Sequence, residues 1–569
     1  MPDSRKNWAV SPYVWLSWLI VVLAALGAVL LADPLADPPL GATDLEGQIL
    51  MGARSQLEPA PLGDWRPDLL VPLKTRIDAW AFEAAGASLV TARRVSAVLA
   101  VLVVALFYAL LAGGGRPGTA FLASGLLATN PVFFGIARTS LPAVASLLLM
   151  LLTIWVWRAG RRSTALAFAG GSLVVLAGVV ENGPRNLFFL FAGGFMFLVL
   201  QLHAWRMAWA GDTRRRLNAV LAGAFLVAVG LGYAVVTNWQ AYGATWGHFS
   251  AATLHLIAAN VVMTPVYVCE IVRLMPIATV IALASFLVFA KELIRPVARH
   301  RELDETRLWF LAWLLSGVVY FALIAAPPLD ALVLLVPPLC AVAAHGLVRL
   351  FAMRSIQRPR LDVMIVMILI SVSVWFLAAL AVQEWVPIGS WGGVWERHQL
   401  RTRFLVILLI WGGGTYLLGW LYLKWKHFTL PLRPLPVTAL AVALTVSAVG
   451  MGLERAGVWW SGRTHEVEAA QGMLKRLDAG ALVAGSWAPL LTLGTPARAA
   501  VIWSGLNDRP ADWQSQVTHL LLQEGRERDA GLPPLEVLEV DLVGSKQVAG
   551  PARVGGRGER RGAGGAAVR

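Results

Sequence analysis

The sequence predicts an α-helical polytopic membrane protein that ends in a small α/β domain. Of its 569 residues, 57% are hydrophobic and only 14% are charged, whereas soluble domains have about 45 to 50% apolar and about 25% charged residues. Apolar runs of roughly 18 to 22 residues recur between residues 13 and 453, and each is long enough to cross about 30 Å of hydrocarbon. After residue 453 the apolar runs become short, and turn residues separate them.

The apolar runs give about thirteen candidate transmembrane helices. The first run is not expected to be a cleaved signal peptide, because it lacks an Ala-x-Ala-like cleavage site and further spans follow it. The candidate spans are 13–33, 95–112, 119–136, 141–158, 164–180, 186–205, 219–237, 276–294, 307–326, 329–350, 361–382, 404–423 and 435–453.

Basic residues in the short connections orient these helices. If Arg5 and Lys6 lie inside the cell, the basic clusters at 158–162, 214–216 and 354–360 lie inside too. We therefore expect a multi-pass plasma-membrane protein with a cytoplasmic N-terminus. The net charge of +14 is spread over membrane boundaries, which indicates contact with membrane lipids and no nucleic-acid partner.

The change in pattern after residue 453 predicts the domain organisation. Residues 1–453 form the transmembrane domain, which includes a long first outer loop at 34–94. Residues 454–550 alternate short apolar runs with the helical stretch "THEVEAAQGMLKRLDAG", which predicts a small outward-facing α/β domain. Residues 551–569 are rich in Gly and Arg with little to bury, so we expect them to be disordered.

The outer loop 34–94 carries two amphipathic patterns. The first has an apolar residue at every fourth position, namely Leu45, Ile49, Ala53 and Leu57. The second, at 75–90, has an apolar stripe formed by Ile77, Trp80, Ala81 and Ala84. Such patterns are typical of helices that lie in the membrane interface.

Acidic residues stand at the start of the first of these helices, and two interpretations of them remain open. Thr43 and Glu46 have the spacing of a capping box, in which both side chains satisfy backbone N–H groups. Alternatively, one carboxylate faces a cavity and takes part in chemistry. Residues i and i+2 of a helix point about 200° apart, so only one of Asp44 and Glu46 faces such a cavity. We favour Asp44, because Glu46 has the cap to satisfy.

The order of motifs in this region resembles a known family. "TDLEGQILMGAR" is followed by Gly63-Asp64-Trp65 and then by "GASLVTARRVSAVLAVL", which opens the second span. This order resembles the lipid-linked-sugar glycosyltransferases of the C superfamily, and most of all the protein O-mannosyltransferase and aminoarabinose-transferase-like families, also labelled family 39. The motif positions here are Asp44 with Glu46, Gly63-Asp64-Trp65, and Gly86, Ser88, Ala92 and Arg93. The resemblance covers about the first 240 residues.

The resemblance implies an activity in the cell envelope. A membrane glycosyltransferase of this kind moves a hexose or pentose from a polyprenyl-phosphate-linked donor to a lipid, glycan or protein acceptor on the outer face. The transfer inverts the anomeric centre. Asp44 would act as the general base and Glu46 as its helper.

A polyprenyl-phosphate donor requires cations that hold its phosphate. The candidates for this role are Arg54, Lys74, Arg76 and Arg138. Further candidates for the donor site are His248, His255 and Arg273. For each cation the alternative is a side chain that extends to lipid headgroups, and for each histidine it is a hydrogen-bonded interfacial residue.

The sequence departs from the family pattern after Arg138. Many family members carry an Asp or Glu near the Pro that follows, but residues 131–145 contain no acid. No cofactor or metal ligand is assigned from the sequence, and a divalent metal is left open. The missing acid leaves a catalytically inactive relative or a scaffold as an alternative function.

A polytopic transporter is the alternative from another class. Ion-coupled transporters place charged residues inside their spans. The spans here carry almost no charge away from their ends, and the acids gather in the outer loop. This distribution favours chemistry at the membrane surface over transport.

Overall fold

The computed structural model describes residues 12–31, 44–58, 71–113, 117–159, 305–323, 332–352, 466–485, 487–501, 516–522, 536–539 and 554–555, together with a few isolated positions. The chain divides into two compact units. The first unit comprises residues 1–32, 97–138 and 142–460, and the second comprises residues 33–96, 139–141 and 461–569. Helix α5, Leu89–Ala112, contributes residues to both.

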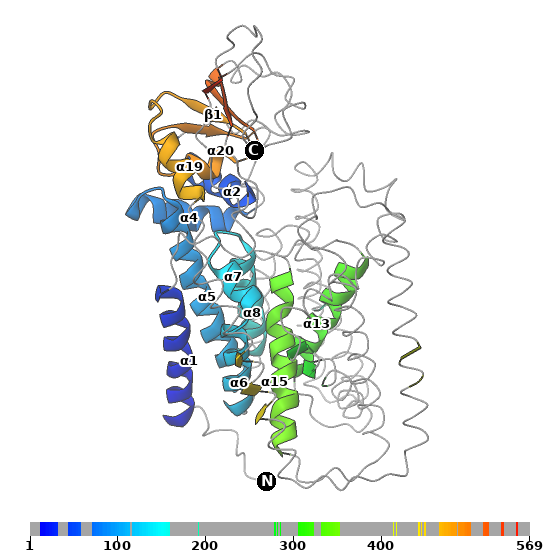
Figure 1. The fold of residues 1–569 in the computed structure, drawn as a ribbon. Coiled ribbons are helices and arrows are strands. Elements are labelled where there is room, and N and C mark those ends of the chain that lie inside the picture. Colours follow the sequence, from blue (N-terminus) through cyan, green and yellow to red (C-terminus); the bar gives the residue numbers. More distant parts are fainter. Residues whose placement is uncertain are drawn as a thin grey trace, which may run out of the picture. The chain divides into compact units, whose positions relative to one another are not determined.

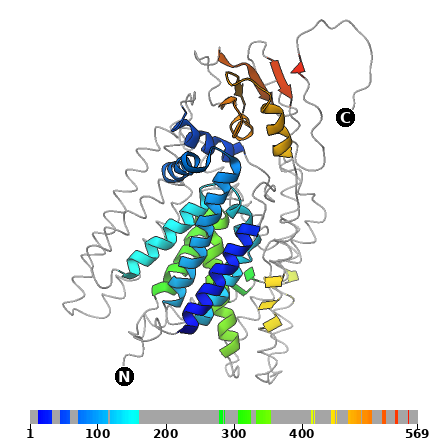
Figure 2. The same ribbon diagram turned by 90° about the vertical axis from the view of Figure 1, so that its left-hand side faces the viewer.

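The described part of the first unit is helical (Figure 1). Besides the C-terminal part of α5, its elements are α1 Pro12–Leu31, α6 Pro117–Ala128, α7 Pro131–Ala137, α8 Ala143–Ala159, α13 Glu305–Leu323, the short 3₁₀ helix η3 Val333–Leu335 and α15 Val336–Ala352. Helix α15 packs against α6 and α13, and α6 also packs against α1 (Figures 1 and 2). Most of the predicted spans between 164 and 294, and those after 361, lie outside the described residues.

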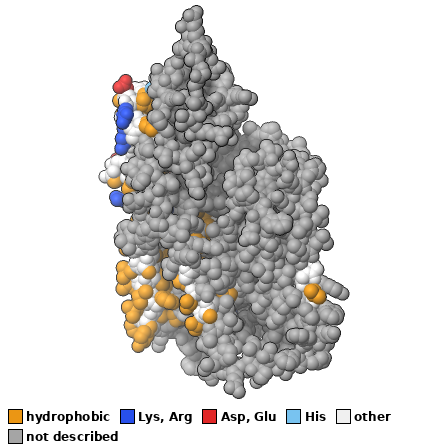
Figure 3. All heavy atoms as spheres, viewed as in Figure 1, with side chains coloured by type: hydrophobic (Ala, Val, Ile, Leu, Met, Phe, Trp, Pro, Cys, Tyr) orange, Lys and Arg blue, Asp and Glu red, His pale blue; other side chains and the backbone are white. Residues whose placement is uncertain are grey.

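Helix α1 is held to α5 by side chains on one face and is exposed on the other. Trp18 Nε1 donates a hydrogen bond to the carbonyl oxygen of Ala105 at 3.2 Å, and the hydroxyls of Ser17 and Tyr108 lie 2.5 Å apart. The exposed face is apolar and includes Tyr13, Trp15, Leu16, Leu19, Ile20 and Leu23. Figure 3 shows hydrophobic side chains gathered at the lower left, where α1 lies in Figure 1. An apolar surface of this kind is what lipid would cover.

Within the described residues, α5 alone has both the length and the apolar character to cross a membrane as one straight helix. Helices α6 and α7 would make a second crossing if they are counted as one bent span. The prediction of about thirteen spans and the predicted orientation therefore stay predictions.

The predicted continuous span 119–136 is wrong in one respect. Helices α6 and α7 meet at an angle of 62°. The cause lies in the sequence "NP": Pro131 lacks a backbone N–H to continue the helical hydrogen bonds, and the Asn130 side chain accepts a hydrogen bond from the N–H of Phe133 at 2.9 Å. Asn130 therefore begins a new helix instead of extending the old one.

The second unit combines helices from the outer loop with a C-terminal sheet. The helices are α2 Asp44–Ser55, α4 Pro72–Ala85, the start of α5, α19 Glu466–Leu474 and α20 Ala488–Leu491. The strands are β1 Leu482–Ala484, β2 Arg498–Ala500, β3 His519–Leu522, β4 Glu536–Glu539 and β5 Val554–Gly555. They form one sheet in the order β2-β1-β3-β4-β5, parallel except for the β4–β5 pair. Strand β5 lies within the 551–569 stretch that the sequence predicts to be disordered.

One apolar core holds this second unit together. Leu50 and Phe82 from the outer-loop helices belong to the same cluster as Leu474, Val483 and Leu490 from the C-terminal part. The sequence pattern separates the 34–94 loop from the 454–550 domain, because composition follows chain order. In the structure the two segments share a core and belong to one compact unit.

Helix α2 is buried on both sides, so the prediction that it is a one-sided interfacial helix is wrong. Its residues 46–53 are all buried. Helix α4 packs on it from one direction and α20 from another. A Cβ added to Gly47 would overlap the backbone nitrogen of Leu490, so glycine permits the close approach of α2 and α20. The C-terminal residues thus cover the face that the sequence pattern assigns to water.

Helix α4 is amphipathic, and its charged side chains Lys74 and Asp78 lie on its buried face. Its buried residues are Lys74, Thr75, Asp78, Ala79 and Phe82. The predicted apolar stripe faces outward instead, and Trp80 on that stripe is 57% exposed. The helix ends at Gly86, whose φ of 86° favours glycine and whose N–H donates to the carbonyl oxygen of Phe82 at 2.8 Å. The orientation of α4 therefore places two charged side chains, Lys74 and Asp78, inside the unit.

Alanine substitutions at Gly47 and Gly472 should have different effects on the stability of the second unit. Gly47→Ala should lower the stability of the second unit by about 1 to 3 kcal/mol, because the new methyl group overlaps Leu490. Gly472→Ala on α19 meets no atom within 4 Å and should be neutral or stabilising by up to about 1 kcal/mol. Melting of the purified protein in detergent measures both changes. Equal melting temperatures for the two variants would contradict the close packing of α2 on α20.

Candidate functional site

A buried ion pair joins the outer-loop helix α2 to the start of α5. The Glu46 carboxylate accepts two hydrogen bonds from Arg93, from Nε to Oε1 and from Nη2 to Oε2, each at 3.0 Å. The side-chain exposures are 0% for Glu46 and 1% for Arg93. Paired contacts of this geometry are the strongest that arginine makes with a carboxylate. They fix the orientation of Glu46 within the second unit.

A second buried ion pair lies within α4. Lys74 and Asp78 are four residues apart on the helix and therefore share one face. Lys74 Nζ donates to both carboxylate oxygens of Asp78, at 2.6 Å to Oδ1 and 2.5 Å to Oδ2. It also donates to the Ser140 hydroxyl at 2.8 Å.

Ser140 connects the two ion pairs. Its backbone N–H donates to Glu46 Oε1 at 2.7 Å, and its hydroxyl donates to Asp78 Oδ2 at 3.3 Å. Residues 139–141 belong to the second unit, although the chain on either side of them belongs to the first. We call Glu46, Arg93, Lys74, Asp78 and Ser140 the charge cluster. All five side chains are buried.

The surroundings of Asp78 change the pKa of its carboxyl group. Burial is the largest influence on Asp78 and raises the pKa of its carboxyl group above the ordinary value, against the opposing effects of Lys74 and the Ser140 hydrogen bond. The nearby Glu46 carboxylate raises the pKa of Asp78 further. The protonated form of the Asp78 carboxyl group is therefore favoured relative to an exposed aspartate.

Short local signals position the members of the charge cluster. Helix α2 begins at Asp44, so Glu46 stands in its first turn. Ser88 caps α5: its hydroxyl accepts from the N–H of Thr91 at 3.1 Å, which places Arg93 just beyond the first turn. Pro72 stands at the first position of α4, and Lys74 follows two residues later.

The structure brings together two of the predicted site residues, Glu46 and Lys74. Asp44, the predicted base, is the first residue of α2, and its side chain lies outside the described part of the structure. Thr43, the partner in the predicted capping box, also lies outside it. So do His248, His255 and Arg273.

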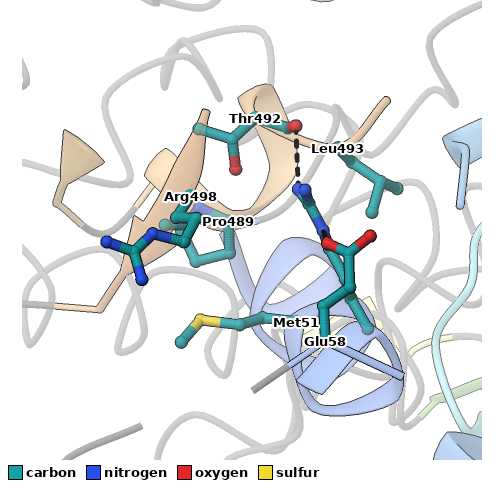
Figure 4. A pocket seen from close by; sticks show the side chains of 8 residues that line it. Met51, Glu58, Pro489, Thr492, Leu493 and Arg498 are labelled. Carbon is teal, nitrogen blue, oxygen red and sulfur yellow. Dashed lines mark hydrogen bonds and ion pairs between the residues drawn. The ribbon is translucent and has the colours of Figure 1, made fainter. Parts of the chain in front are cut away.

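Arg54 is engaged by the C-terminal residues. Its Nη1 donates to the carbonyl oxygens of Thr492 at 3.3 Å and Ala497 at 3.4 Å, and its Nε pairs with Glu58 at 3.1 Å. A pocket of about 30 Å³ lies beside it, with room for about one water molecule. Figure 4 shows Arg498 at this pocket with its guanidinium turned away from Glu58.

The other two predicted cations have different surroundings. Arg76 is exposed, donates to Gln56 Oε1 at 3.0 Å and lies over the Trp80 ring at 5.7 Å. Arg138, in the first unit, is buried and lies over the Phe134 ring at 5.7 Å.

Sequence reasoning missed Asp78 and Ser140. The family pattern directs attention to residues 131–145, whereas the carboxylate of Asp78 comes from α4. The spacing of four between Lys74 and Asp78 was the detectable signal, because it places both side chains on one face of the helix. Among the described residues, no group of three His, Cys, Asp or Glu side chains is placed to hold a metal ion.

Comparisons with known proteins give only distant structural likenesses. No family model and no curated protein matches the sequence. The crystal structure of ArnT from Cupriavidus metallidurans bound to undecaprenyl phosphate is similar with a TM-score of 0.46 and 12% identity, over 86% of this chain and 85% of that one.

An archaeal protein is similar at the same level. The Archaeoglobus fulgidus oligosaccharyltransferase in complex with Zn and sulfate has a TM-score of 0.45 and 12% identity, over 84% of this chain. This chain spans only 62% of the length of that enzyme. Both likenesses are remote, and likenesses at this level assign neither an activity nor site residues.

Removing one partner of the Glu46–Arg93 pair should destabilise the second unit strongly. Arg93→Met leaves the Glu46 carboxylate buried without its main partner, which should cost about 3 to 5 kcal/mol. Arg94→Met, at the exposed neighbouring position, is the matched control and should cost about 0.5 kcal/mol or less.

Thermal melting in detergent measures these effects, and the double variant Glu46→Leu/Arg93→Met should recover part of the loss. Equal melting temperatures for the Arg93 and Arg94 variants would show that the Glu46–Arg93 pair is unimportant for stability.

Proposed function

We propose that the chain is an integral-membrane glycosyltransferase. It would transfer a sugar from a polyprenyl-phosphate-linked donor to a lipid, glycan or protein acceptor on the outer face of the membrane, with inversion. The observation that supports this most is the charge cluster, a buried group of two carboxylates and two cations that includes Glu46, two residues after Asp44 on α2. The motif order around Asp44 and Arg93 resembles the same enzyme class.

The reaction needs a base and a cation at fixed positions. The Asp44 carboxylate would remove the proton from an acceptor hydroxyl as its oxygen attacks the anomeric carbon. The bond between that carbon and the phosphate oxygen breaks, and the phosphate leaves with the electron pair. Attack from the face opposite the leaving phosphate inverts the anomeric centre. Asp44 serves as the base in this proposal because the oxygens of Glu46 already accept from Arg93 and Ser140.

Glu46 therefore has a positioning role in this proposal. Its contacts to Arg93 and Ser140 hold the first turn of α2, and the Asp44 backbone belongs to that same turn. A small shift of a catalytic group can slow a reaction by about a hundredfold. Glu46 would act through Asp44 rather than on the substrate.

Lys74 is the cation that we propose for the donor phosphate. It is buried, and its ammonium group lies in the charge cluster. The contacts of Arg54 and Arg76 support structural roles for those two residues, in the C-terminal contact and at Trp80. Arg138 precedes Ser140 by two residues and remains a second proposed phosphate ligand, while His248, His255 and Arg273 remain predictions from the sequence.

The base assignment predicts the effect of one conservative substitution. Asp44→Asn keeps the size of the side chain but cannot accept the proton, so transfer should fall by at least about a hundredfold. Transfer of radiolabelled sugar from polyprenyl-phosphate donors to endogenous acceptors in membranes measures it. Glu58→Gln is the control, because Glu58 is exposed and should leave transfer unchanged.

The outcomes separate the functions. Transfer by the wild type that survives Asp44→Asn would mean that another group is the base. Absence of transfer from every donor in the wild type would favour a non-catalytic relative. Solute movement in liposomes without any lipid-linked sugar would favour the transporter.

A further inference from the structure

The charge cluster has no net charge to offer an anion. Glu46 and Asp78 carry one negative charge each, and Arg93 and Lys74 carry one positive charge each, so the four formal charges cancel. All four side chains are buried, where an unpaired charge is strongly unfavourable. A phosphate added to this group as it stands would leave one negative charge uncompensated. The cluster needs one more positive charge, or one fewer negative charge, to bind it.

All three N–H donors of the Lys74 ammonium group are already in hydrogen bonds. An ammonium group has three N–H donors. In the structure they reach Asp78 Oδ1, Asp78 Oδ2 and Ser140 Oγ. A phosphate oxygen can bind Lys74 only if Asp78 gives up at least one of its two contacts.

If Asp78 takes up a proton, it loses its negative charge and can release Lys74. The cluster then has a net positive charge, and Lys74 has an N–H donor for a phosphate oxygen. We propose that Asp78 is the exchangeable counter-ion of the donor site: it takes up one proton when the anionic phosphate binds to Lys74. The inference rests on the proposed function, because it takes a polyprenyl phosphodiester as the ligand.

The exchange balances without a covalent change. Before binding, the Asp78 carboxylate pairs with the Lys74 ammonium group. After binding, the phosphodiester anion pairs with that ammonium group, and Asp78 is a neutral carboxylic acid that has gained one proton from solvent. Its new O–H lies close to the Ser140 hydroxyl, 3.3 Å from Oδ2, and can donate to it. The cluster and its ligand together are again neutral.

Asp78 fits this role better than Glu46 does. The oxygens of Glu46 already accept from three N–H donors, two on Arg93 and one on the Ser140 backbone, and none of these contacts involves Lys74. Asp78 is held only by Lys74 and the Ser140 hydroxyl among the described contacts, and Lys74 is the partner that the phosphate would claim.

The groups that face Asp78 act on its proton affinity in known directions. Lys74 on α4 and the Ser140 hydroxyl lower its pKa, while burial and the Glu46 carboxylate on α2 raise it. Arg93 on α5 acts through Glu46, with which it is paired. Because the raising effects exceed the lowering ones, the folded protein keeps this proton at a pH where the unfolded chain has lost it. The contribution to stability is full at low pH and is lost as the pH rises through the folded value.

A neighbouring hydroxyl is also available to a ligand. Thr75 follows Lys74 on the buried face of α4, three residues before Asp78. Its hydroxyl is buried and has no hydrogen-bond partner among the described residues. A buried hydroxyl without a partner is unfavourable, and a phosphate oxygen nearby could accept from it.

The test measures binding of a phosphodiester probe as a function of pH. Decaprenyl methyl phosphate is suitable because its single negative charge does not titrate near neutral pH, and decaprenol is the uncharged control. Binding of each to the full chain in detergent is measured by calorimetry from about pH 5.5 to about pH 8.5. Each titration is repeated in buffers with different ionisation enthalpies, which counts the protons taken up without any substitution.

For the wild type we expect the Kd of the phosphodiester to rise by up to about tenfold per pH unit above the pKa of Asp78, with uptake of close to one proton. Asp78→Asn resembles the protonated acid, so its Kd should be independent of pH and lower than that of the wild type at high pH. Glu83→Gln, at an exposed position of the same helix, should behave as the wild type does.

Two results would overturn the inference, and they are distinguishable. Binding of the phosphodiester with no proton uptake and no pH dependence would remove the role of Asp78 and leave the proposed function standing. Failure of the wild type to bind the phosphodiester at any pH, or equal binding of decaprenol, would remove the proposed function as well. If Asp78→Asn does not fold, the proton count of the wild type still decides.

Discussion

The arrangement of the buried charges in the second unit depends on the junction at Ser140. This residue contributes three contacts: its N–H holds Glu46, its hydroxyl accepts from Lys74, and the same hydroxyl donates to Asp78. Through these contacts, two ion pairs on three helices become one buried network. Residues 139–141 belong to the second unit, although the residues directly before and after them belong to the first. Ser140 contributes its backbone N–H and its hydroxyl to the charge cluster. A residue without the hydroxyl would leave Lys74 with an unused donor in a buried place.

A buried network of ion pairs contributes little net stability to a fold. Removing two charges from water costs about as much as their attraction returns, and an apolar replacement of equal volume is often as stable. The apolar cluster around Leu50, Leu490 and Val483 already holds α2 against the C-terminal residues. The charge cluster therefore adds little that the apolar core does not supply. What the charge cluster adds is geometry: it fixes the orientation of Glu46 and holds Lys74 Nζ against Asp78 and Ser140 inside the unit.

The sequence allowed the helices of the outer loop to be located but not oriented. The four-residue repeats and capping residues predicted helices close to α2 and α4, and the acid-containing motif pointed to Glu46. The interfacial pattern of α4 left open which residues face the protein, and in the structure Trp80 is exposed while Lys74 is inside. The contact of α2 with α20 also escaped prediction. A glycine such as Gly47 signals a close approach only when its neighbour, Leu490, is known.

The position of α2 has a consequence for the C-terminal residues. Because α20 packs on α2 at Gly47, and the carbonyl groups of Thr492 and Ala497 bind Arg54, the C-terminal part holds α2 near both of its ends. The Asp44 backbone begins that same helix. A change in the C-terminal part would therefore move the first turn of α2, even though it touches no proposed catalytic group. This gives the C-terminal part a physical route to the proposed chemistry, because it contacts the helix whose first residue is the proposed base.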